Sequence, residues 1–463
     1  MKEQVEEFRK VAHEAVDWIA DYLADPRRYR VLPDMKPGDL VDRLAGAAPE
    51  TGTPLGQLVE EFHHSIMPAV THWNHPRFMA YFACTSSPPG ILGEMLAAAL
   101  DTNGIQWIAS PAVAELEQVT LNWLRQWLAL PEEWFGIIFD TASTSSLHAM
   151  AAAREFADPQ SHRRGGLGQL TVYASDQAHS SIEKAVVAVG LGQENFRKIA
   201  SDDKFRMRPE ALRAAIEQDL AAGKKPCCVT ATIGTTSTTS VDPLEQIVAV
   251  AREYGAWVHV DAAYAGTAAI LPECRHILNG IEQADSLVMN PHKWMLTPVD
   301  LSAFFTRQPK ILRRAFSLVP EYLRGTGDPR AVSYMEYGIP LGRRFRSLKL
   351  WFIMRHYGRQ GVAAMLRNHL RWTSELDAKI KAHPDFEVVA PTLFSVVCFR
   401  LRGSDEANLR LFEALNASGE VFLSKTVLRG QTVLHLAIGN AGTTEDDIEA
   451  VWETVQRLAK TVV

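Results

Sequence analysis

The sequence predicts an α/β protein with a mostly parallel central sheet, a helical N-terminal arm and a small α+β domain at the C-terminus. Between residues 88 and 350, short β-branched runs alternate with helical stretches, as in a parallel sheet. Before that region apolar residues repeat at helical spacing, and after it helices and strand-like runs are mixed. We therefore expect three parts, at residues 1–87, 88–350 and 351–463.

The N-terminal arm is expected to consist of helices without a core of their own. An arm with so little apolar content must pack on the main body or on a second subunit. We favour the second subunit, which predicts a homodimer. The apolar residues that recur at helical spacing, up to Pro26 and again after Pro54, are Val5, Phe8, Ala12, Ala15, Ile19, Leu23, Leu58, Phe62 and Ile66.

The two later parts are expected to hold the strands. In the large domain the strand-like runs are residues 135–139, 170–174, 227–233, 257–260 and 286–289. In the small domain we expect helices within residues 351–380, strands at 395–400 and 433–438, and a closing helix from Thr444.

Composition narrows the class of protein. With 463 residues and 47% hydrophobic content the chain can bury a large core. A net charge of −6 without a long basic run disfavours nucleic acid and anionic membranes as partners. The sequence has no run of 18 apolar residues and no apolar signal core, and its five cysteines are an odd number. These features predict a soluble, cytoplasmic protein with a small-molecule substrate.

No metal site is expected. The histidines that cluster in the sequence lack an accompanying carboxylate or cysteine pattern. They are His63, His64, His72 and His75.

Lys293 is the first candidate for chemistry, because apolar residues flank it on both sides. Removal from water lowers the pKa of an amine and prepares it for imine formation. The alternative is a lysine whose stem is buried while its charge reaches solvent at the end of a strand.

Asp261 is the second candidate, because it ends a strand-like run and is followed by small residues. One helix and one strand fit between Asp261 and Lys293, so both side chains can face one pocket from adjacent strand ends. Pyridoxal phosphate needs such a pair, a lysine for its aldehyde and an acid for its ring nitrogen. The alternative is that Asp261 caps a helix.

A phosphate site is predicted at residues 140–146, where hydroxyl-bearing and small residues lie between a strand and a helix. Ser and Thr clusters also form ordinary turns and caps. Residues 319–329 combine glycines, prolines and charges, as mobile loops do, and Tyr322 within them is able to reach a site when the loop closes. Alternatively, Tyr322 packs locally on a surface loop.

Four motifs together resemble the aromatic L-amino-acid decarboxylases. They are residues 175–181, 259–266, 290–294 and 339–349, in the family's order and across nearly the whole chain. The resemblance implies a pyridoxal-phosphate enzyme of aspartate-aminotransferase-like fold (fold type I). It also implies a homodimer with active sites at the subunit interface.

The same resemblance assigns roles residue by residue. Lys293 would form the Schiff base with pyridoxal 5'-phosphate, and Asp261 would pair with the pyridine nitrogen. His179 would stack on one face of the ring and Ala263 would pack on the other. The phosphate would be held by Ala142, Ser143 and Asn290, while Thr236 and His292 would line the same site.

The implied reaction is decarboxylation of an aromatic L-amino acid through a quinonoid, with Tyr322 as proton donor and His179 as a relay. Relatives that consume oxygen and release aldehydes replace the loop tyrosine by phenylalanine or the stacking histidine by asparagine. This chain has Tyr322 and His179, so we expect an amine product. The alternative is an aromatic aldehyde synthase.

Substrate-binding residues are also implied. Aromatic walls suit an aromatic side chain, and Ile105 and Val299 stand where animal DOPA decarboxylases carry phenylalanine. We expect tryptophan or 5-hydroxytryptophan to be preferred; the alternative is a DOPA-preferring enzyme. The matched pocket positions are Trp73, Tyr81, Phe82, Ile105, Val299 and Gly342.

Other classes of protein fit less well. Glycines 165, 166 and 168 precede a strand instead of following one, which disfavours a nicotinamide oxidoreductase. A serine hydrolase would need a Gly-x-Ser-x-Gly elbow, and the sequence contains none. A noncatalytic binding protein of the same fold would be expected to have lost Lys293, Asp261 or His179.

Overall fold

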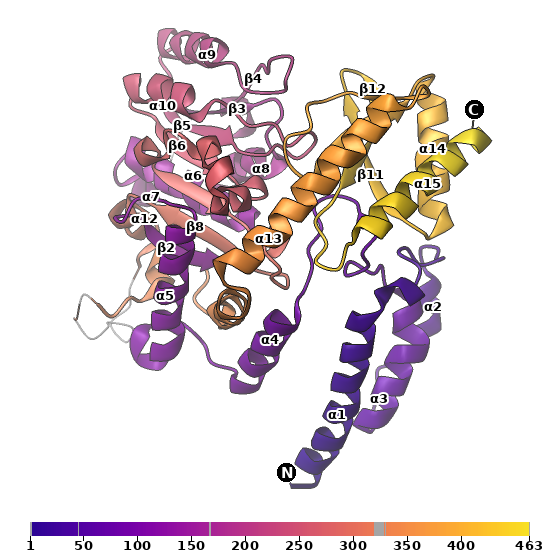
Figure 1. The fold of residues 1–463 in the computed structure, drawn as a ribbon. Helices are drawn as coiled ribbons and strands as arrows, with labels where there is room; N and C mark the ends of the chain where they lie inside the picture. The colour runs from indigo at the N-terminus through magenta and orange to yellow at the C-terminus, as the bar shows by residue number, and fades with distance from the viewer. Residues whose placement is uncertain (1, 45, 166–167, 319–327, 329, 463) are drawn as a thin grey trace. The chain divides into compact units, whose positions relative to one another are not determined.

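The computed structural model describes residues 2–44, 46–165, 168–318, 328 and 330–462. Tyr322 therefore lies outside the described residues. By their internal contacts these residues divide into two compact units. Unit 1 comprises residues 1–83, 380–387 and 399–463, and unit 2 comprises residues 84–379 and 388–398 (Figure 1).

Unit 2 is built on a seven-stranded sheet in the order β2-β8-β7-β6-β5-β3-β4. Strands β3 to β7 pair in parallel, and β8 pairs antiparallel with both β2 and β7. The α/β class with a mostly parallel sheet is confirmed. The strands are β2 (Phe135–Phe139), β3 (Leu170–Ser175), β4 (Phe196–Ile199), β5 (Lys225–Thr232), β6 (Trp257–Asp261), β7 (Ser286–Met289) and β8 (Ser302–Thr306).

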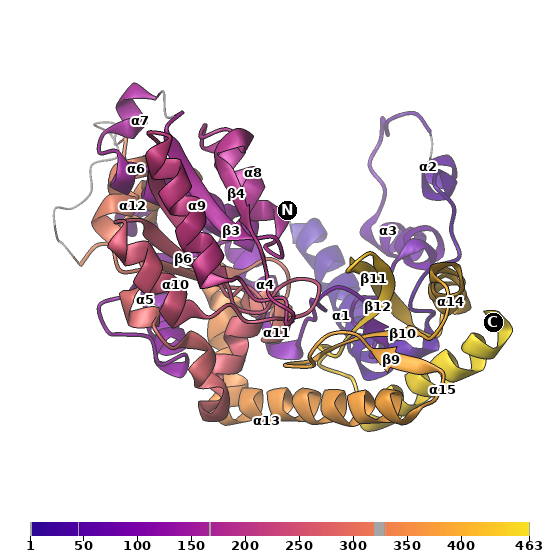
Figure 2. The same ribbon diagram turned by 90° about the horizontal axis from the view of Figure 1, so that it is seen from above.

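Helices cover the sheet of unit 2. Helix α6 (Ala142–Ala157) packs against β5, β6 and β7, and α9 (Pro209–Ala221) and α10 (Leu244–Glu253) pack against β5. The last two lie side by side (Figure 1 and Figure 2). Because β3, β6 and β7 are buried throughout, their sequences read as nearly continuous apolar runs.

Further helices and turns complete unit 2. The long helix α13 is interrupted at Gly358, where φ is 60°. The α-helices are α4 (Pro88–Leu100), α5 (Pro111–Trp127), α7 (Ser161–Arg164), α8 (Ser180–Ala188), α11 (Pro291–Trp294), α12 (Pro309–Phe316) and α13 (Arg346–Ala382). The 3-10 turns are η4 (Trp107–Ala109), η5 (Gln193–Asn195), η6 (Ala265–Ile270), η7 (Pro272–Leu278), η8 (Ile281–Gln283) and η10 (Tyr334–Tyr337).

Unit 1 joins the two ends of the chain. Its sheet has the order β1-β11-β12-β10-β9, with β1 parallel to β11 and β11 antiparallel to β12. The strands of this sheet are β1 (Phe78–Met79), β9 (Phe386–Val388), β10 (Val396–Leu401), β11 (Phe422–Leu428) and β12 (Gln431–Ala437), of which residues 388 and 396–398 are counted in unit 2. The helices and turns are α1 (Lys2–Ala24), η1 (Pro26–Arg28), α2 (Asp39–Leu44), α3 (Leu55–Glu61), η2 (Phe62–Ile66), η3 (Met67–Ala69), α14 (Asp405–Ser418) and α15 (Glu445–Val462).

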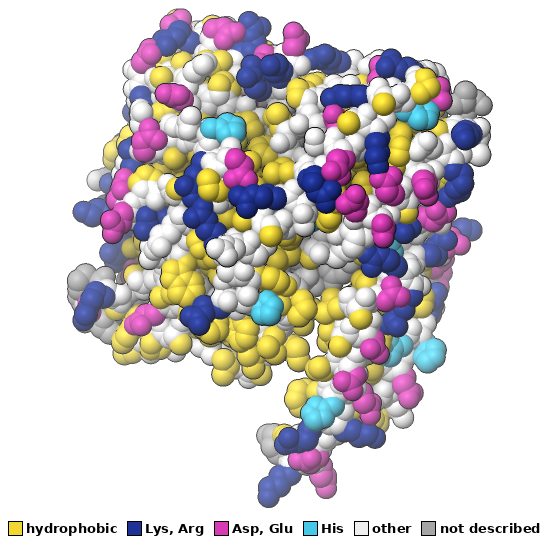
Figure 3. All heavy atoms as spheres, in the orientation of Figure 1, with side chains coloured by type: hydrophobic (Ala, Val, Ile, Leu, Met, Phe, Trp, Pro, Cys, Tyr) yellow, Lys and Arg dark blue, Asp and Glu magenta, His cyan; other side chains and the backbone are white. Residues whose placement is uncertain are grey.

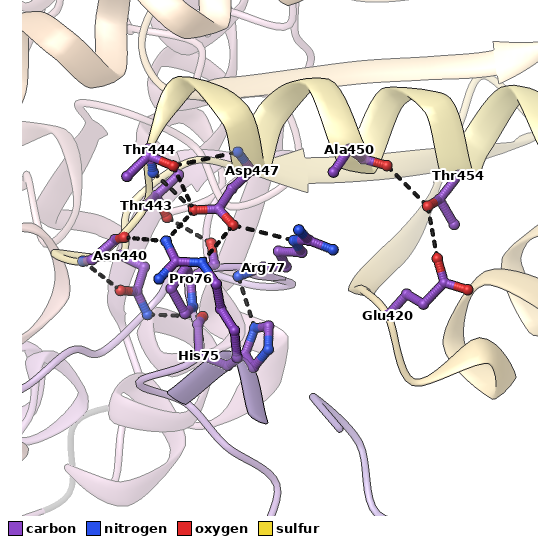
Figure 4. A network of polar contacts seen from close by, with 12 residues as sticks. His75, Pro76, Arg77, Glu420, Asn440, Thr443, Thr444, Asp447, Ala450 and Thr454 are labelled. Atoms are coloured by element: carbon purple, nitrogen blue, oxygen red, sulfur yellow. Dashed lines mark hydrogen bonds and ion pairs between the residues drawn. The ribbon is translucent and has the colours of Figure 1, made fainter. Parts of the chain in front are cut away.

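Asp447 is the centre of a polar network in unit 1 (Figure 4). Its carboxylate accepts hydrogen bonds from Arg27 Nη2 at 2.6 Å and Arg77 Nε at 3.2 Å. It also accepts from the backbone N of Thr444 at 3.0 Å, while Asp447 N donates to Thr444 Oγ1, so the two residues form a capping box at the start of α15. These donors hold the pKa of Asp447 down, at about 2, although burial opposes them.

Apolar side chains remain exposed on both units. None of the 23 residues of α1 is buried, and Phe8 is 62% exposed. In unit 2, yellow apolar side chains gather over α4 (Figure 3), where Leu92, Met95, Leu96 and Leu100 are exposed. Among the described residues, no helix combines the length and apolar character needed to cross a membrane.

Candidate active site

Asp261 and Lys293 come from neighbouring strands of the sheet in unit 2. Asp261 is the last residue of β6, and it stands beside Val288 of the parallel strand β7. Lys293 lies in the short helix α11 that follows β7. Because parallel strands end at one edge of the sheet, the carboxylate and the amine meet there.

The Asp261 carboxylate is buried and only 5% exposed. Its Oδ1 accepts a hydrogen bond from the backbone N of Ala263 at 3.1 Å. The carboxylate acts electrostatically on both Lys293 and His179. The structure therefore places these three side chains in one neighbourhood, as the sequence predicts.

Burial lowers the pKa of Lys293, while the charge of Asp261 opposes this shift. The helix that carries Lys293 is fixed by the next residue, Trp294. The indole Nε1 of Trp294 donates to His369 Nδ1 at 3.0 Å, and its ring stacks on Tyr264 with centroids 4.9 Å apart. Lys293 is thus a partly buried amine on a rigid support.

Asn290 and His292 form a pair whose hydrogen bonds can be assigned from their surroundings. His292 Nδ1 accepts from the backbone N of Leu301 at 3.0 Å, and burial lowers the pKa of His292 to about 4. The neutral ring therefore carries its proton on Nε2, which lies 3.3 Å from the Asn290 amide. The amide orientation that satisfies both groups puts Oδ1 on His292 and leaves the NH2 as a buried, unused donor.

Ala142 and Ser143 form the first turn of α6. Thr141 precedes them as the N-cap and accepts from Thr144 N. The first N–H groups of a helix have no intrahelical acceptor, so this turn is suited to an anion. Strands β2 and β7 are both antiparallel to β8, so β2 ends at the same edge of the sheet as β6 and β7. Helix α6 follows β2, and its first turn therefore lies at the edge that carries Asp261 and Lys293.

The orientation of His179 is set by the helix that it begins. His179 is the N-cap of α8, and its Nδ1 accepts from Ser181 N at 3.1 Å. Its proton in the neutral form is therefore on Nε2. The pKa of His179 is lowered, mainly because the surrounding protein displaces water, and Asp261 partly offsets this. His179 is a neutral donor through Nε2 near neutral pH.

Thr236 is exposed, in the loop that follows β5. This loop starts beside Asp261, because Ile233 N donates to Asp261 O at 2.8 Å. The loop also needs a glycine at its second position, since a Cβ at Gly234 would lie 2.5 Å from the Cβ of Ala265.

The predicted substrate residues fall in both units. In unit 2, Ile105 and Gly342 lie in segments joined by the hydrogen bond from Gly104 N to Arg343 O at 2.8 Å. Val299, also in unit 2, is 61% exposed.

In unit 1, Trp73 stacks on Tyr81 with centroids 6.0 Å apart, and Phe82 is buried beside the ring of His435. The backbone oxygen of Trp73 accepts a hydrogen bond from Asn440 Nδ2 at 3.0 Å.

One residue that sequence reasoning passed over lies beside the amine. Cys84 acts electrostatically on Lys293, and burial raises the pKa of the Cys84 thiol to about 11, so it is neutral. In the sequence, Cys84 is one of five cysteines with no assigned role. No local pattern links residue 84 to residue 293, so only the fold reveals their proximity.

The residues described here suit pyridoxal phosphate. The N–H groups at the start of α6 suit a phosphate, and so does the NH2 of Asn290 in the amide orientation assigned above, where it takes the place of the unpartnered buried Oδ1. The buried carboxylate of Asp261 suits a protonated ring nitrogen, and the amine of Lys293 suits an aldehyde.

Comparisons with known proteins agree with this chemistry. The pyridoxal-dependent decarboxylase conserved domain matches residues 37–402. An aromatic-L-amino-acid decarboxylase from Bos taurus is 41% identical over 474 residues, covering 99% of this chain and 97% of the relative. Phenylacetaldehyde synthase from Rosa hybrid cultivar is 39% identical over 485 residues, covering 99% of this chain and 95% of that protein.

Solved structures show the same fold. The crystal structure of Oryza sativa TDC with PLP and tryptamine has a TM-score of 0.95 and 36% identity, covering 98% of both chains. Catharanthus roseus tryptophan decarboxylase in complex with L-tryptophan has a TM-score of 0.94 and 39% identity, covering 99% of both chains. The chain therefore belongs to the pyridoxal-phosphate-dependent aromatic-L-amino-acid decarboxylase family, and pyridoxal phosphate is its cofactor.

Proposed function

We propose that the protein converts an aromatic L-amino acid into the corresponding arylalkylamine and CO2, and that tryptophan or 5-hydroxytryptophan is preferred. The observation that carries this proposal is the meeting of Asp261 and Lys293 at adjacent strand ends. Bound pyridoxal phosphate supplies an electron sink for the electron pair that remains when the carboxylate leaves.

In this proposal each residue has a distinct task. Lys293 holds the cofactor through its amine, and the buried Asp261 carboxylate keeps a proton on the ring nitrogen. His179 presents its Nε2–H to the site from a fixed position, because Ser181 holds its other nitrogen. His292 is a positioning residue, since its two nitrogens are engaged by Leu301 and Asn290.

Phosphate binding is assigned to Ala142, Ser143 and Asn290. The first two offer backbone N–H groups at a helix N-terminus, and the third offers its amide NH2. Ala263 is assigned to pack against the cofactor ring. Its hydrogen bonds to two other proposed cofactor residues support this, because its backbone N donates to Asp261 Oδ1 and its backbone O accepts from Asn290 N at 3.0 Å. Thr236, in the loop that starts beside Asp261, is assigned to form a hydrogen bond with the cofactor or the substrate.

Amine is expected as the product because the chain has both His179 and Tyr322. Tyr322 supplies the proton that ends the decarboxylation. Replacing Tyr322 by phenylalanine is expected to shift the products from amine to aldehyde, hydrogen peroxide and ammonia. Amine, aldehyde and peroxide are measured on the same reaction, with dissolved oxygen followed in parallel.

Two outcomes would contradict this part of the proposal. Aldehyde and peroxide as the main products of the unaltered protein would make it an aldehyde synthase, like the Rosa relative. Unchanged amine output from Tyr322→Phe would remove Tyr322 from the proton transfer. Tyr357→Phe, a partly buried tyrosine of α13, is the matched control and is expected to keep the amine product.

Substrate preference is proposed from Ile105 and Val299, which replace larger aromatic side chains of animal DOPA decarboxylases. The freed space favours an indole over a catechol ring, and Gly342 adds no side chain beyond its backbone. Tryptophan decarboxylase 2 from Oryza sativa, 40% identical over 475 residues, is consistent with this choice.

The specificity constant kcat/KM for tryptophan or 5-hydroxytryptophan is therefore expected to exceed that for DOPA by about tenfold or more. Tyrosine, phenylalanine and histidine complete the comparison. A higher constant for DOPA would refute the preference and leave the decarboxylase activity standing. An Ile105→Phe variant is expected to lower the ratio of kcat/KM for tryptophan to kcat/KM for DOPA.

A homodimer is proposed from the exposed apolar surfaces. The exposed side chains of α4 and the exposed Val299, Ile339 and Leu341 lie on unit 2, and α1 on unit 1 buries none of its residues. Such surfaces are typical of an interface. Sedimentation equilibrium is expected to give about twice the chain mass of 51.4 kDa; a monomer at micromolar concentration would contradict this.

A further inference from the structure

The two substrate positions of unit 2, Ile105 and Gly342, are far apart in the sequence but are tied together by neighbouring residues. Asn103 Oδ1 accepts from the backbone N of Arg343 at 2.8 Å, and Gly104 N donates to Arg343 O at 2.8 Å. Both backbone polar groups of Arg343 are therefore bonded to the segment that carries Ile105.

Gly104 lies between Arg343 and helix α5. A Cβ at residue 104 would lie 2.7 Å from Val113 Cγ1 of α5, so a side chain there would displace Val113 or residue 104 itself. The distance of 3.4 Å from this Cβ to Arg343 O would be an ordinary contact.

The side chain of Arg343 anchors the two hydrogen-bonded segments, here called the junction of residues 103–105 and 342–343, in the interior of unit 2. Its Nη2 donates to Glu117 Oε1 and to the backbone oxygen of Ile138, both at 2.7 Å. The side chains are buried, at 8% exposed for Arg343 and 2% for Glu117. The guanidinium also lies 4.6 Å from the ring centroid of Tyr334.

Glu117 completes the anchor on the edge strand of the sheet. Its Oε1 accepts from Ile138 N at 2.8 Å, so the pair satisfies both backbone polar groups of Ile138. Ile138 belongs to β2, which pairs only with β8 in the described sheet. Arg343 and Glu117 thus fix the junction to β2. Residues held by a strand keep their positions more precisely than residues held by a loop.

A second tie holds the segment that leads to Gly342. The backbone N of Ile339 donates to His148 Nε2 at 3.0 Å, and His148 Nδ1 donates to Thr144 O at 2.7 Å. His148 is fully buried in α6, the helix that begins with Ala142 and Ser143. The segment that leads to Gly342 and the proposed phosphate-binding turn at Ala142 and Ser143 are therefore connected through one helix, α6.

We propose that Arg343 and Glu117 are positioning residues that set the separation between Ile105 and Gly342, and thereby the selectivity among aromatic side chains. This inference rests on the proposed function, in which Ile105 and Gly342 face the substrate ring. Neither Arg343 nor Glu117 contacts the substrate in this proposal. They act by fixing two short backbone segments to β2.

The test compares Arg343→Met, Arg343→Lys and the double variant Arg343→Met/Glu117→Gln with the unaltered protein. The kcat/KM ratio of tryptophan to phenylalanine is expected to change by about tenfold or more in Arg343→Met, mainly through KM. Arg343→Lys keeps the charge and one hydrogen bond. Its kcat/KM ratio is therefore expected to lie between that of the unaltered protein and that of Arg343→Met. Arg367→Met is the matched control, because Arg367 pairs with Glu273 in an exposed ion pair of unit 2.

A ratio within twofold of the unaltered value in folded, cofactor-loaded Arg343→Met would overturn the inference. If that variant does not fold, Asn103→Ala decides, because Asn103 is exposed and the change removes only the tie to Arg343 N. The same shift in ratio supports the inference, and an unchanged ratio overturns it.

Failure of the proposed function is seen separately, as the absence of amine from the unaltered protein with every substrate. In that case the ratio of dissociation constants for the two amino acids, read from the cofactor absorbance, replaces kcat/KM. A changed binding ratio in Arg343→Met would support the positioning role, and an unchanged one would overturn it.

Discussion

Replacing Lys293 by alanine is expected to lower kcat for amine formation by at least about 10³-fold, because the amine that holds the cofactor is lost. Burial lowers the pKa of Lys293, so a larger share of it is neutral and nucleophilic at a given pH than for an exposed lysine.

Two measurements check this prediction. Amine formation from tryptophan is followed in the purified variant, and its absorbance spectrum is recorded after cofactor addition. The visible band of the unaltered protein is expected to disappear in Lys293→Ala. Lys310→Ala, an exposed lysine in α12 of the same unit, is the control and is expected to keep both band and activity. A rate within tenfold of the unaltered protein would exclude Lys293 as the cofactor lysine.

Replacing Asp447 by alanine is expected to lower the free energy of unfolding by about 2–3 kcal/mol, because hydrogen bonds to a charged group contribute about 1.5–3 kcal/mol. The change leaves Arg27 and Arg77 without their carboxylate and removes the capping box of α15. Asp447 itself is 2% exposed, whereas Arg27 and Arg77 are 36% and 29% exposed, so water hydrates the two arginines in the variant and limits the loss.

Urea unfolding followed by circular dichroism measures this loss. Asp446→Ala is the matched control, because Asp446 occupies the same first turn of α15 but is exposed. Its loss is expected to stay below about 1 kcal/mol, the range for a charge at a helix N-terminus. Equal losses in the two variants would show that the network around Asp447 contributes nothing beyond the helix end.

The same carboxylate predicts a dependence of stability on pH. The pKa of Asp447 is lowered from 3.8 to about 2 in the folded protein. Its contribution, about 2 kcal/mol, is fully present above the unfolded pKa and is lost as the pH falls through the folded pKa. The difference in unfolding free energy between the unaltered protein and Asp447→Ala is therefore expected to shrink between pH 4 and pH 2.

The buried parallel strands could be predicted from the sequence, whereas the strands outside that pattern could not. Strands β6 and β7 are buried throughout, so their apolar runs stand out. Strand β8 was missed, and its Ser302 and Thr306 interrupt the apolar pattern at both ends. Strand β1 has two residues and exists only because β11 lies beside it, which no local pattern reveals.

The candidate site divides in the same way. Asp261 and Lys293 could be predicted as a pair because each follows a recognisable strand. The tie between Asn290 and His292, the proximity of Cys84 to Lys293, and the anchor formed by Arg343 and Glu117 depend on contacts across the fold. The role of Tyr322 stays a prediction.

The pairing of Arg27 with Asp447 has a consequence for the order in which the chain folds during synthesis. The two residues are 420 positions apart, so about 20–80 s of translation separate them at ordinary rates. Over that interval the N-terminal segment of unit 1 has neither β11 nor α15 to pack against. Unit 2 has all its strands before β11 is made, so we infer that it folds first and that the N-terminal segment waits for β11 and α15. A chain truncated before β11 is expected to leave residues 2–83 open to proteolysis while unit 2 resists.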